Sequence, residues 1–214
     1  MRKRFVADSW NLDSKSLLRR QGVIMANLNF ITPRLATGGD LPEGIDEALT
    51  DLRAWEELGI THVVDNRREW SDAEFVAEHS PGIEYLHNGV DDRGEDMPDE
   101  WFDTGVRFVL AALVEPDAKV LVHCHMGINR GPSLTYASLL ALGWDPIEAM
   151  AAIRTTRPIA AIGYADDALD WHHRRRRVER TTQVENWRRM DEWYDANPID
   201  VVRIIKQIRL GEAS

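Results

Sequence analysis

Short apolar runs and longer amphipathic segments alternate along this chain of 214 residues. A run of about four to eight residues rich in Val, Ile and Leu is typical of a buried strand, whereas apolar positions repeated every three or four residues are typical of a helix with one packed face. The pattern predicts strands near 23–30, 34–37, 61–65, 83–87 and 119–123, and helices near 45–58, 98–114, 132–142, 146–155, 166–195 and 198–210.

The last of these helices has a clear start in the sequence. Asn197 can cap it, and Pro198 suits its first position. Asp200 adds an early carboxylate, and Gly211 follows its last turn. We expect its apolar stripe to pack on its own domain, and the alternative is a homodimer contact through the C-terminal helices. The stripe consists of Ile199, Val202, Ile205 and Ile208.

The chain has one cysteine, Cys124, which lies six residues before Arg130 in the predicted loop between a strand and an apolar helix. The N-terminus of a helix carries unsatisfied N–H groups and a partial positive charge, so it favours a bound oxyanion and a cysteine thiolate. The planar guanidinium of Arg130 can bind two phosphate oxygens at once. These features predict a phosphate-binding loop with a thiolate nucleophile, built from His125, Met126, Gly127, Ile128, Asn129 and Arg130.

The arrangement His-Cys-x5-Arg after a strand resembles the cysteine-dependent protein phosphatases and, within them, the dual-specificity class. Rhodanese-like and arsenate-reductase-like folds also use Cys-x5-Arg, so the rest of the chain matters. The resemblance continues in order and spacing over residues 27–175. Its further segments are 31–38, 58–65, 83–87, the acidic pair at 91–92, the aromatic pair at 101–102, and 153–158.

This resemblance implies an α/β fold in which a central mixed, largely parallel sheet is flanked by helices. It also implies a division of the chain into three parts. We expect an N-terminal segment at 1–22, a catalytic domain at 23–175 and a C-terminal helical extension at 176–214.

The resemblance also implies a mechanism that requires neither a metal nor a cofactor. The Cys124 thiolate would attack phosphorus to form a phosphocysteine, which water then hydrolyses, while Arg130 and the loop amides hold the phosphate oxygens. The family's general acid lies about thirty residues before the cysteine. Asp92 has this spacing, and alignment of the aromatic pair at 101–102 selects it over the adjacent Asp91.

Three neighbours of the loop are candidate supporting residues. His123 ends the strand and would either hydrogen-bond near the cysteine or simply pack in the core. Gly131 stands where the family usually has Ser or Thr, whose hydroxyl speeds breakdown of the phosphoenzyme, so we expect slower turnover. Alternatively, the backbone there requires glycine. Ser133 or Thr135 could then supply the missing hydroxyl.

Charge and composition limit the kinds of molecule that we expect the protein to bind. A formal net charge of −10 disfavours general binding to nucleic acid. The run 174–177 of four arginines is either a solvated helix face or a docking patch for an anionic partner. One cysteine excludes an intramolecular disulfide, and no apolar stretch approaches eighteen residues, so we expect no membrane association and a cytoplasmic location.

The substrate is the least determined point. The loop lacks the lysines of lipid-phosphate members, which disfavours phosphoinositides. We expect a phosphorylated protein substrate, carrying phosphotyrosine and also phosphoserine or phosphothreonine. The pair Asn129-Arg130 is similar to that of the RNA 5′-triphosphatase branch, so an RNA or nucleotide phosphatase is one alternative. A glucan or lipid phosphatase and a binding-only pseudophosphatase are the others.

Overall fold

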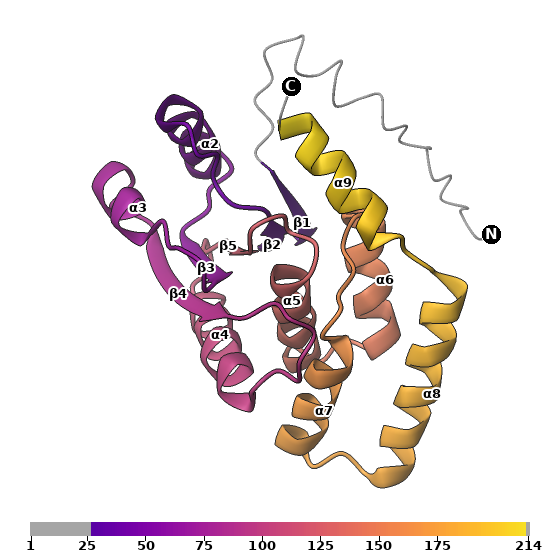
Figure 1. Ribbon diagram of the computed structural model, residues 1–214. Helices are drawn as coiled ribbons and strands as arrows, with labels where there is room; N and C mark the ends of the chain where they lie inside the picture. The colour runs from indigo at the N-terminus through magenta and orange to yellow at the C-terminus, as the bar shows by residue number, and fades with distance from the viewer. Residues whose placement is uncertain (1–26, 213–214) are drawn as a thin grey trace, which may run out of the picture.

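The computed structural model describes residues 27–212, in which a five-stranded sheet has the strand order β1-β2-β5-β3-β4 (Figure 1). The first two strands pair antiparallel, and the other pairs are parallel. The expected mixed, largely parallel sheet is therefore confirmed. The predicted N-terminal segment 1–22 lies outside the described residues, as does the first part of the strand predicted near 23–30. The strands are β1 (Leu28–Thr32), β2 (Leu35–Gly38), β3 (His62–Arg67), β4 (Glu84–Val90) and β5 (Val120–His123).

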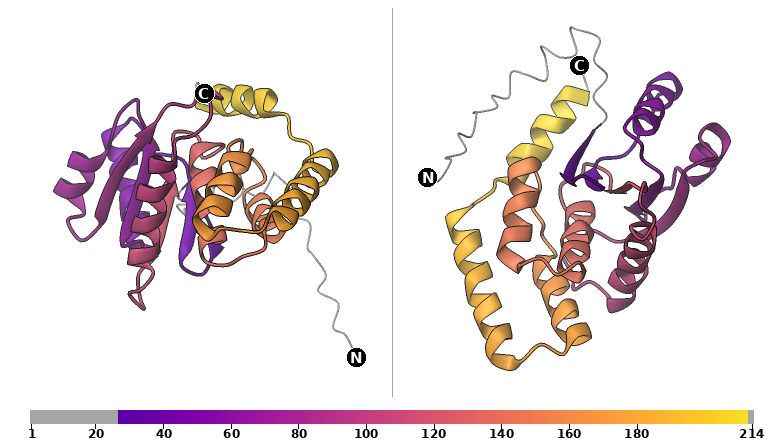
Figure 2. Two further views of the ribbon diagram at one scale, coloured as in Figure 1. Left: turned by 90° about the horizontal axis from the view of Figure 1, so that it is seen from below. Right: turned by 180° about the vertical axis from the view of Figure 1, so that it is seen from behind.

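Helices cover both faces of the sheet (Figure 2). Helices α2 (Ile45–Glu57) and α3 (Ala73–His79) pack on one face. The other face carries four helices, and α8 and α9 follow them in the chain. These six are α4 (Asp99–Ala112), α5 (Arg130–Ala141), α6 (Pro146–Thr156), α7 (Ala165–Arg176), α8 (Arg180–Ala196) and α9 (Val201–Glu212).

The three central strands β2, β3 and β5 are buried along their whole length because helices cover both of their faces. Successive side chains of a strand point to opposite faces, so neighbours along one strand enter different cores. Val64 and Val122 join the core under α4 and α5, whereas Val63 and Leu121 join the core under α2. Burial of each such side chain stabilises the fold by about 1.5–3 kcal/mol, which holds the sheet as a rigid platform for the loops at its edge.

The single helix expected over 166–195 is two helices in the structure. Arg177 adopts the left-handed conformation, with φ of 51°, and ends α7. The backbone N–H groups of Arg177 and Val178 donate to the last carbonyls of α7, at Arg174 and His173, with distances of 3.3 and 3.1 Å. Left-handed helix ends usually carry glycine, and the sequence has a run of good helix formers here instead. Nothing in the sequence around Arg177 therefore indicated that a helix ends there.

Two further elements differ from expectation. The sequence did not predict the short helix α3, whose N-cap is Asp72; Ser71, just before it, accepts a hydrogen bond from the Ala73 backbone N–H at 3.2 Å. Helix α9 begins at Val201 rather than near 198, because Asp200 accepts from the backbone N–H of Arg203 at 2.9 Å. Asn197 instead ends α8.

The apolar stripe of α9 is displaced from the expected one. Val202 is 63% exposed, and Ile199 precedes the helix. Half-buried positions fall instead at Val201, Ile204, Ile205 and Ile208. The stripe thus lies partly against its own chain, and the alternative of a contact between two copies stays a prediction.

Helix α8 belongs to the main core. Met190 is 2% exposed within it, and Trp193 and Tyr194 pack against the same core. Across residues 27–212 none of the helices has both the length and the apolar character needed to cross a bilayer.

Candidate active site

The carboxyl ends of four parallel strands meet at one edge of the sheet. Gly38 of β2 pairs with His123 of β5, and His123 pairs with Asp65 of β3. Crevices at such edges are the usual ligand sites of open α/β sheets. The loops that follow these strands carry Asp40, Glu69, Asp92 and Cys124.

Cys124 lines a pocket of about 460 Å³ and lies in the loop between β5 and α5. It is only 3% exposed. The loop turns tightly at Gly127, where φ is +64° and a Cβ would contact the Arg157 guanidinium and lie 2.5 Å from the Gly38 carbonyl oxygen. Only glycine fits there, so the sequence of the loop determines its curvature. The other loop residues that line the pocket are His125, Met126, Ile128, Asn129 and Arg130.

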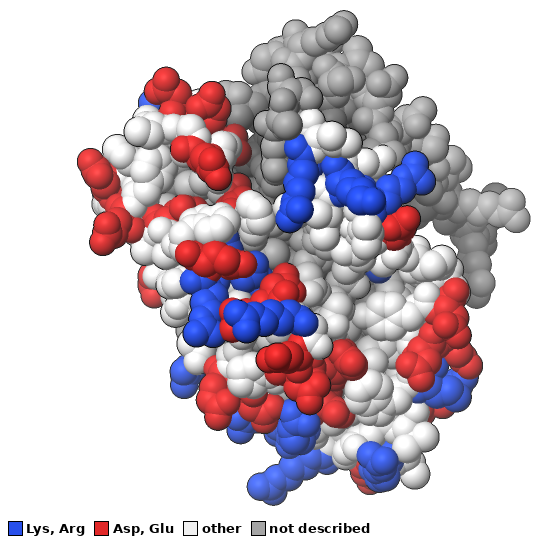
Figure 3. All heavy atoms as spheres, in the orientation of Figure 1, with Lys and Arg blue, Asp and Glu red and all other residues white. Residues whose placement is uncertain are grey.

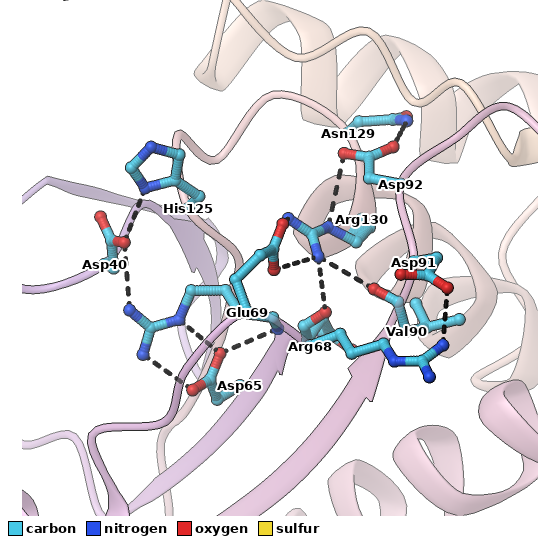
Figure 4. Close-up of polar contacts among 12 residues, drawn as sticks. Asp40, Asp65, Arg68, Glu69, Val90, Asp91, Asp92, His125, Asn129 and Arg130 are labelled. Atoms are coloured by element: carbon cyan, nitrogen blue, oxygen red, sulfur yellow. Dashed lines mark hydrogen bonds and ion pairs between the residues drawn. The ribbon is translucent and has the colours of Figure 1, made fainter.

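Arg130 is buried and held in position by a carboxylate from another loop (Figure 4). Its Nη1 and Nη2 atoms donate to the two carboxylate oxygens of Glu69 at 2.8 and 3.0 Å, and Nη1 also donates to the Val90 carbonyl at 2.9 Å. Burial is the largest influence and opposes the charge, but the hydrogen bonds to Glu69 together with the nearby negative charges of Cys124 and Asp92 outweigh it and raise the pKa of Arg130. The same bonds lower the pKa of Glu69.

One donor of Arg130 is unused. Its buried Nε atom has no hydrogen-bond partner among the described residues and lies 3.4 Å from the Asp92 carboxylate. This N–H group is therefore available to a bound anion, whereas the Glu69 side of the guanidinium is occupied.

The two adjacent aspartates point in different directions (Figure 4). Asp92 Oδ1 accepts hydrogen bonds from Asn129 Nδ2 at 2.7 Å and from the Tyr164 hydroxyl at 2.6 Å. Asp91 instead pairs with the exposed Arg68 at 2.6 Å. Of the pair, Asp92 is thus the one that lies over the cysteine loop. Burial, followed by the bond to Asp92, raises the pKa of Tyr164 to about 12, so Tyr164 remains a hydrogen-bond donor.

His125 lies inside the loop and forms part of a charged network. Its Nδ1 atom is 2.8 Å from the Asp40 carboxylate, which also accepts from Arg67 at 3.0 Å. Arg67 is fully buried and makes two hydrogen bonds to Asp65, both of 2.8 Å. The Trp70 ring stands edge-on to the imidazole, with centroids 5.1 Å apart. The network fixes the orientation of the imidazole at the pocket wall.

His123 is a packed core residue in this structure. Within residues 27–212 neither ring nitrogen has a hydrogen-bond partner, and the closest carboxylate oxygen, of Asp65, is 3.9 Å away. The Trp55 and Tyr85 rings contact the imidazole. Burial lowers the pKa of His123, so the ring is neutral. The hydrogen bond near the cysteine is not formed, and packing is the arrangement observed.

Gly131 lies in the first turn of α5, and its φ is not positive, so a left-handed backbone is not the reason for glycine there. A Cβ would lie 3.1–3.2 Å from backbone atoms of His123 and Cys124. Glycine therefore permits close approach of the helix to the strand end. Ser133 Oγ accepts from the Tyr164 N–H at 3.2 Å. The Thr135 hydroxyl donates to the Gly131 carbonyl at 2.9 Å, so its proton is not available to the sulfur.

Arg157 supports the loop from behind, a role that the sequence did not reveal. It is 3% exposed. Its Nε donates to the Gly127 carbonyl at 2.6 Å and its Nη2 to the Met126 carbonyl at 3.0 Å. Burial lowers the pKa of Arg157 to about 10. The only indication of this role in the sequence was that Arg157 lies near the end of segment 153–158, one of the segments of the family resemblance.

The connection between α6 and α7 forms another wall of the pocket. Ala161 N–H donates to the Ile128 carbonyl at 2.7 Å, and Gly163 N–H donates to Asn129 Oδ1 at 2.6 Å. Between them Ile162 has φ of 57°, which is uncommon for a β-branched residue. Its carbonyl accepts from the Tyr194 hydroxyl of α8 at 2.9 Å. Helix α8 therefore holds this wall in place.

The arginine run 174–177 lies outside the pocket. Arg174 and Arg175 form ion pairs with Asp99 and Asp103 of α4, and Arg176 donates to the Ala141 carbonyl at 2.9 Å. Three of the four arginines thus bind within the chain, as expected for a solvated helix face.

Comparison with known proteins identifies clear relatives. A model of the dual specificity phosphatase catalytic domain matches residues 46–165. Human dual specificity protein phosphatase 13B is 29% identical over 147 residues, which cover 65% of this chain and 69% of that protein. Dual specificity protein phosphatase 26 of Rattus norvegicus is 32% identical over 98 residues, or 45% of this chain, which thus spans about half of that relative (46%).

Solved structures share the fold at lower identity. Human DUSP28 has a TM-score of 0.58 at 17% identity, covering 71% of this chain and all (100%) of that one. PTPMT1 in complex with PI(5)P has a TM-score of 0.56 at 18% identity, covering 69% of this chain and 96% of that one. The expected phosphatase-like fold is confirmed.

Proposed function

Because the chain belongs to the dual-specificity phosphatase family and is a cysteine-dependent phosphatase, we propose that it hydrolyses phosphotyrosine, and also phosphoserine or phosphothreonine, through a phosphocysteine intermediate. The observation that carries the proposal is the convergence of Asp92 and the unused Nε of Arg130 over the loop of Cys124.

In the first step the Cys124 thiolate attacks phosphorus, so that an S–P bond forms while the bond from phosphorus to the leaving oxygen breaks. Asp92 donates its proton to that oxygen. Arg130 binds the phosphate through Nε, and the loop amides bind the remaining oxygens. Anchoring by Glu69 means that the guanidinium needs little reorganisation when the substrate arrives.

In the second step water attacks phosphorus and the S–P bond breaks. Asp92, now a carboxylate, takes the proton from the water. The hydrogen bonds from Asn129 and Tyr164 support this role, because they hold the carboxylate at the pocket rim in both steps.

An aryl phosphate suits this pocket. Beside the polar loop, it offers the apolar surfaces of Ile128 and Ala161, against which a phenyl ring can pack. The net charge of −10 weighs against RNA, whose phosphates a catalytic groove would have to attract.

The test compares purified protein on a small aryl phosphate, a phosphotyrosine peptide, a phosphoserine peptide and an RNA 5′-triphosphate. We expect turnover of both aryl substrates, slower turnover of the phosphoserine peptide, and trapping of a phosphocysteine on rapid acid quench. Preferred hydrolysis of the RNA would contradict the substrate assignment. Phosphate binding without turnover of any substrate would instead indicate a binding-only protein.

A further inference from the structure

Helix α9 forms one wall of the pocket that contains Cys124. Val201, Ile205 and Arg209 all line this pocket, and their spacing of four residues places them on one face of the helix. Figure 1 shows α9 at the end of the sheet where the loop between β5 and α5 lies. The family match covers 46–165, so this wall comes from a part of the chain beyond that match.

The cations of α9 are free to bind a ligand. Arg203, Lys206 and Arg209 are exposed, and within the described part of the chain their side chains form no ion pair or hydrogen bond. Figure 3 shows positive side chains gathered over this helix. By contrast, Arg188 and Arg189 of α8 are paired with carboxylates. Only Arg209 of the α9 cations lines the pocket.

The two carboxylates that line the pocket do not neutralise the positive charge of Arg209. Glu69 is engaged by Arg130, and Asp92 is engaged by Asn129 and Tyr164. A substrate that places its phosphate at the cysteine loop therefore meets an uncompensated cation on another wall of the same pocket.

We propose that α9 determines substrate specificity, with Val201 and Ile205 packing against the substrate and Arg209 binding a second anionic group beside the phosphate. The substrate class is a phosphotyrosine peptide with an acidic or phosphorylated residue close to the phosphotyrosine. This inference rests on the proposed function of the same site. A peptide is favoured over a lipid surface because a net charge of −10 is repelled by anionic membranes.

The test measures kcat/KM on two phosphotyrosine peptides that differ only in having Glu or Gln beside the phosphotyrosine, with a small aryl phosphate that carries no second charged group as reference. We expect wild type to prefer the Glu peptide by roughly fivefold, as for a partly exposed ion pair, and less at high salt. Arg209→Ala should remove the preference and Arg209→Glu should reverse it, each read as the ratio of kcat/KM between the two peptides, so that any general change in activity cancels. Arg203→Ala, on the same helix but outside the pocket, is the matched control and should keep the preference.

The outcomes separate the two proposals. Failure of wild type to hydrolyse any aryl phosphate would overturn the proposed function. Hydrolysis with equal rates on both peptides, or an equal loss on both in Arg209→Ala, would leave the phosphatase intact and overturn the role of α9. A stronger effect with phosphoinositide vesicles than with the Glu peptide would overturn the choice of a peptide substrate.

Discussion

Removal of the Glu69 carboxylate tests whether Arg130 must be held from outside its loop. Glu69→Ala deletes two charge-assisted hydrogen bonds, of 2.8 and 3.0 Å, to a guanidinium whose side chain is 3% exposed. The Val90 carbonyl at 2.9 Å remains as an acceptor. Arg130 would then be free to rotate toward the pocket and would lose its fixed alignment with the phosphate.

The expected loss of kcat/KM in Glu69→Ala follows from these contacts. Two hydrogen bonds to a charged group are worth about 3–6 kcal/mol when buried. The Glu69 side chain is 47% exposed, so solvent screening reduces this to about 1–2 kcal/mol. That corresponds to a loss of roughly 5- to 30-fold in kcat/KM, because each 1.4 kcal/mol is about tenfold.

The assay is kcat/KM for a small aryl phosphate, together with the inhibition constant of inorganic phosphate. Both should worsen in Glu69→Ala, whereas Cys124 alkylation should still occur. Arg130 lowers the pKa of Glu69, so the pair is intact above the ordinary range of a glutamate and is lost only as pH falls through the lowered value. The defect should therefore be constant across pH 5–8.

The matched control is Glu185→Ala, which removes a similarly short but exposed pair with Arg188 on α8, of 2.6 Å. We expect no change in activity there. A change of less than twofold in Glu69→Ala would refute the claim that Glu69 positions Arg130.

Four further changes have defined outcomes. Cys124→Ser should lower aryl-phosphate turnover by roughly a thousandfold or more without loss of phosphate binding, and near-normal turnover would rule out thiolate catalysis. Asp92→Asn should strongly slow phosphotyrosine hydrolysis and barely affect activated aryl phosphates, whereas Asp91→Asn should do neither; the opposite pattern would move the acid by one residue. Gly131→Ala should cost about 1 kcal/mol of unfolding free energy, because its Cβ meets backbone atoms, and Gly131→Ser should hydrolyse the phosphocysteine faster than Gly131→Ala does; equal burst kinetics in the two would exclude a role for the hydroxyl. Arg157→Met should lower both Tm and kcat/KM, because the carbonyls of the loop lose their donors, and an unchanged Tm would show that the loop holds itself.

The sequence predicted those parts of the site whose structure depends on neighbouring residues. The strand before Cys124, the loop that contains Gly127 and the helix after Arg130 lie within one short segment, and the structure brings these residues together as expected. Asp92 followed from spacing, and its position at the rim agrees with that choice, although its role as the acid stays a prediction.

The missed residues act through distant contacts. Glu69 is 61 positions from Arg130, and nothing around it distinguishes it from a solvated carboxylate. Arg157 reaches Gly127 from 30 positions away. Tertiary packing also decided the end of α7, where a non-glycine residue occupies the left-handed conformation.

The hydrogen bond from Tyr194 to the Ile162 carbonyl bears on how this protein can be shortened for experiments. The left-handed backbone at Ile162 costs about 1–3 kcal/mol, and α8 provides the partner that holds it. A shortened version that ends where the family match ends, at 165, would contain every residue of the proposed chemistry but would lack this partner and the whole of α9. The smallest unit that can be expressed without altering the pocket is therefore larger than the unit defined by homology.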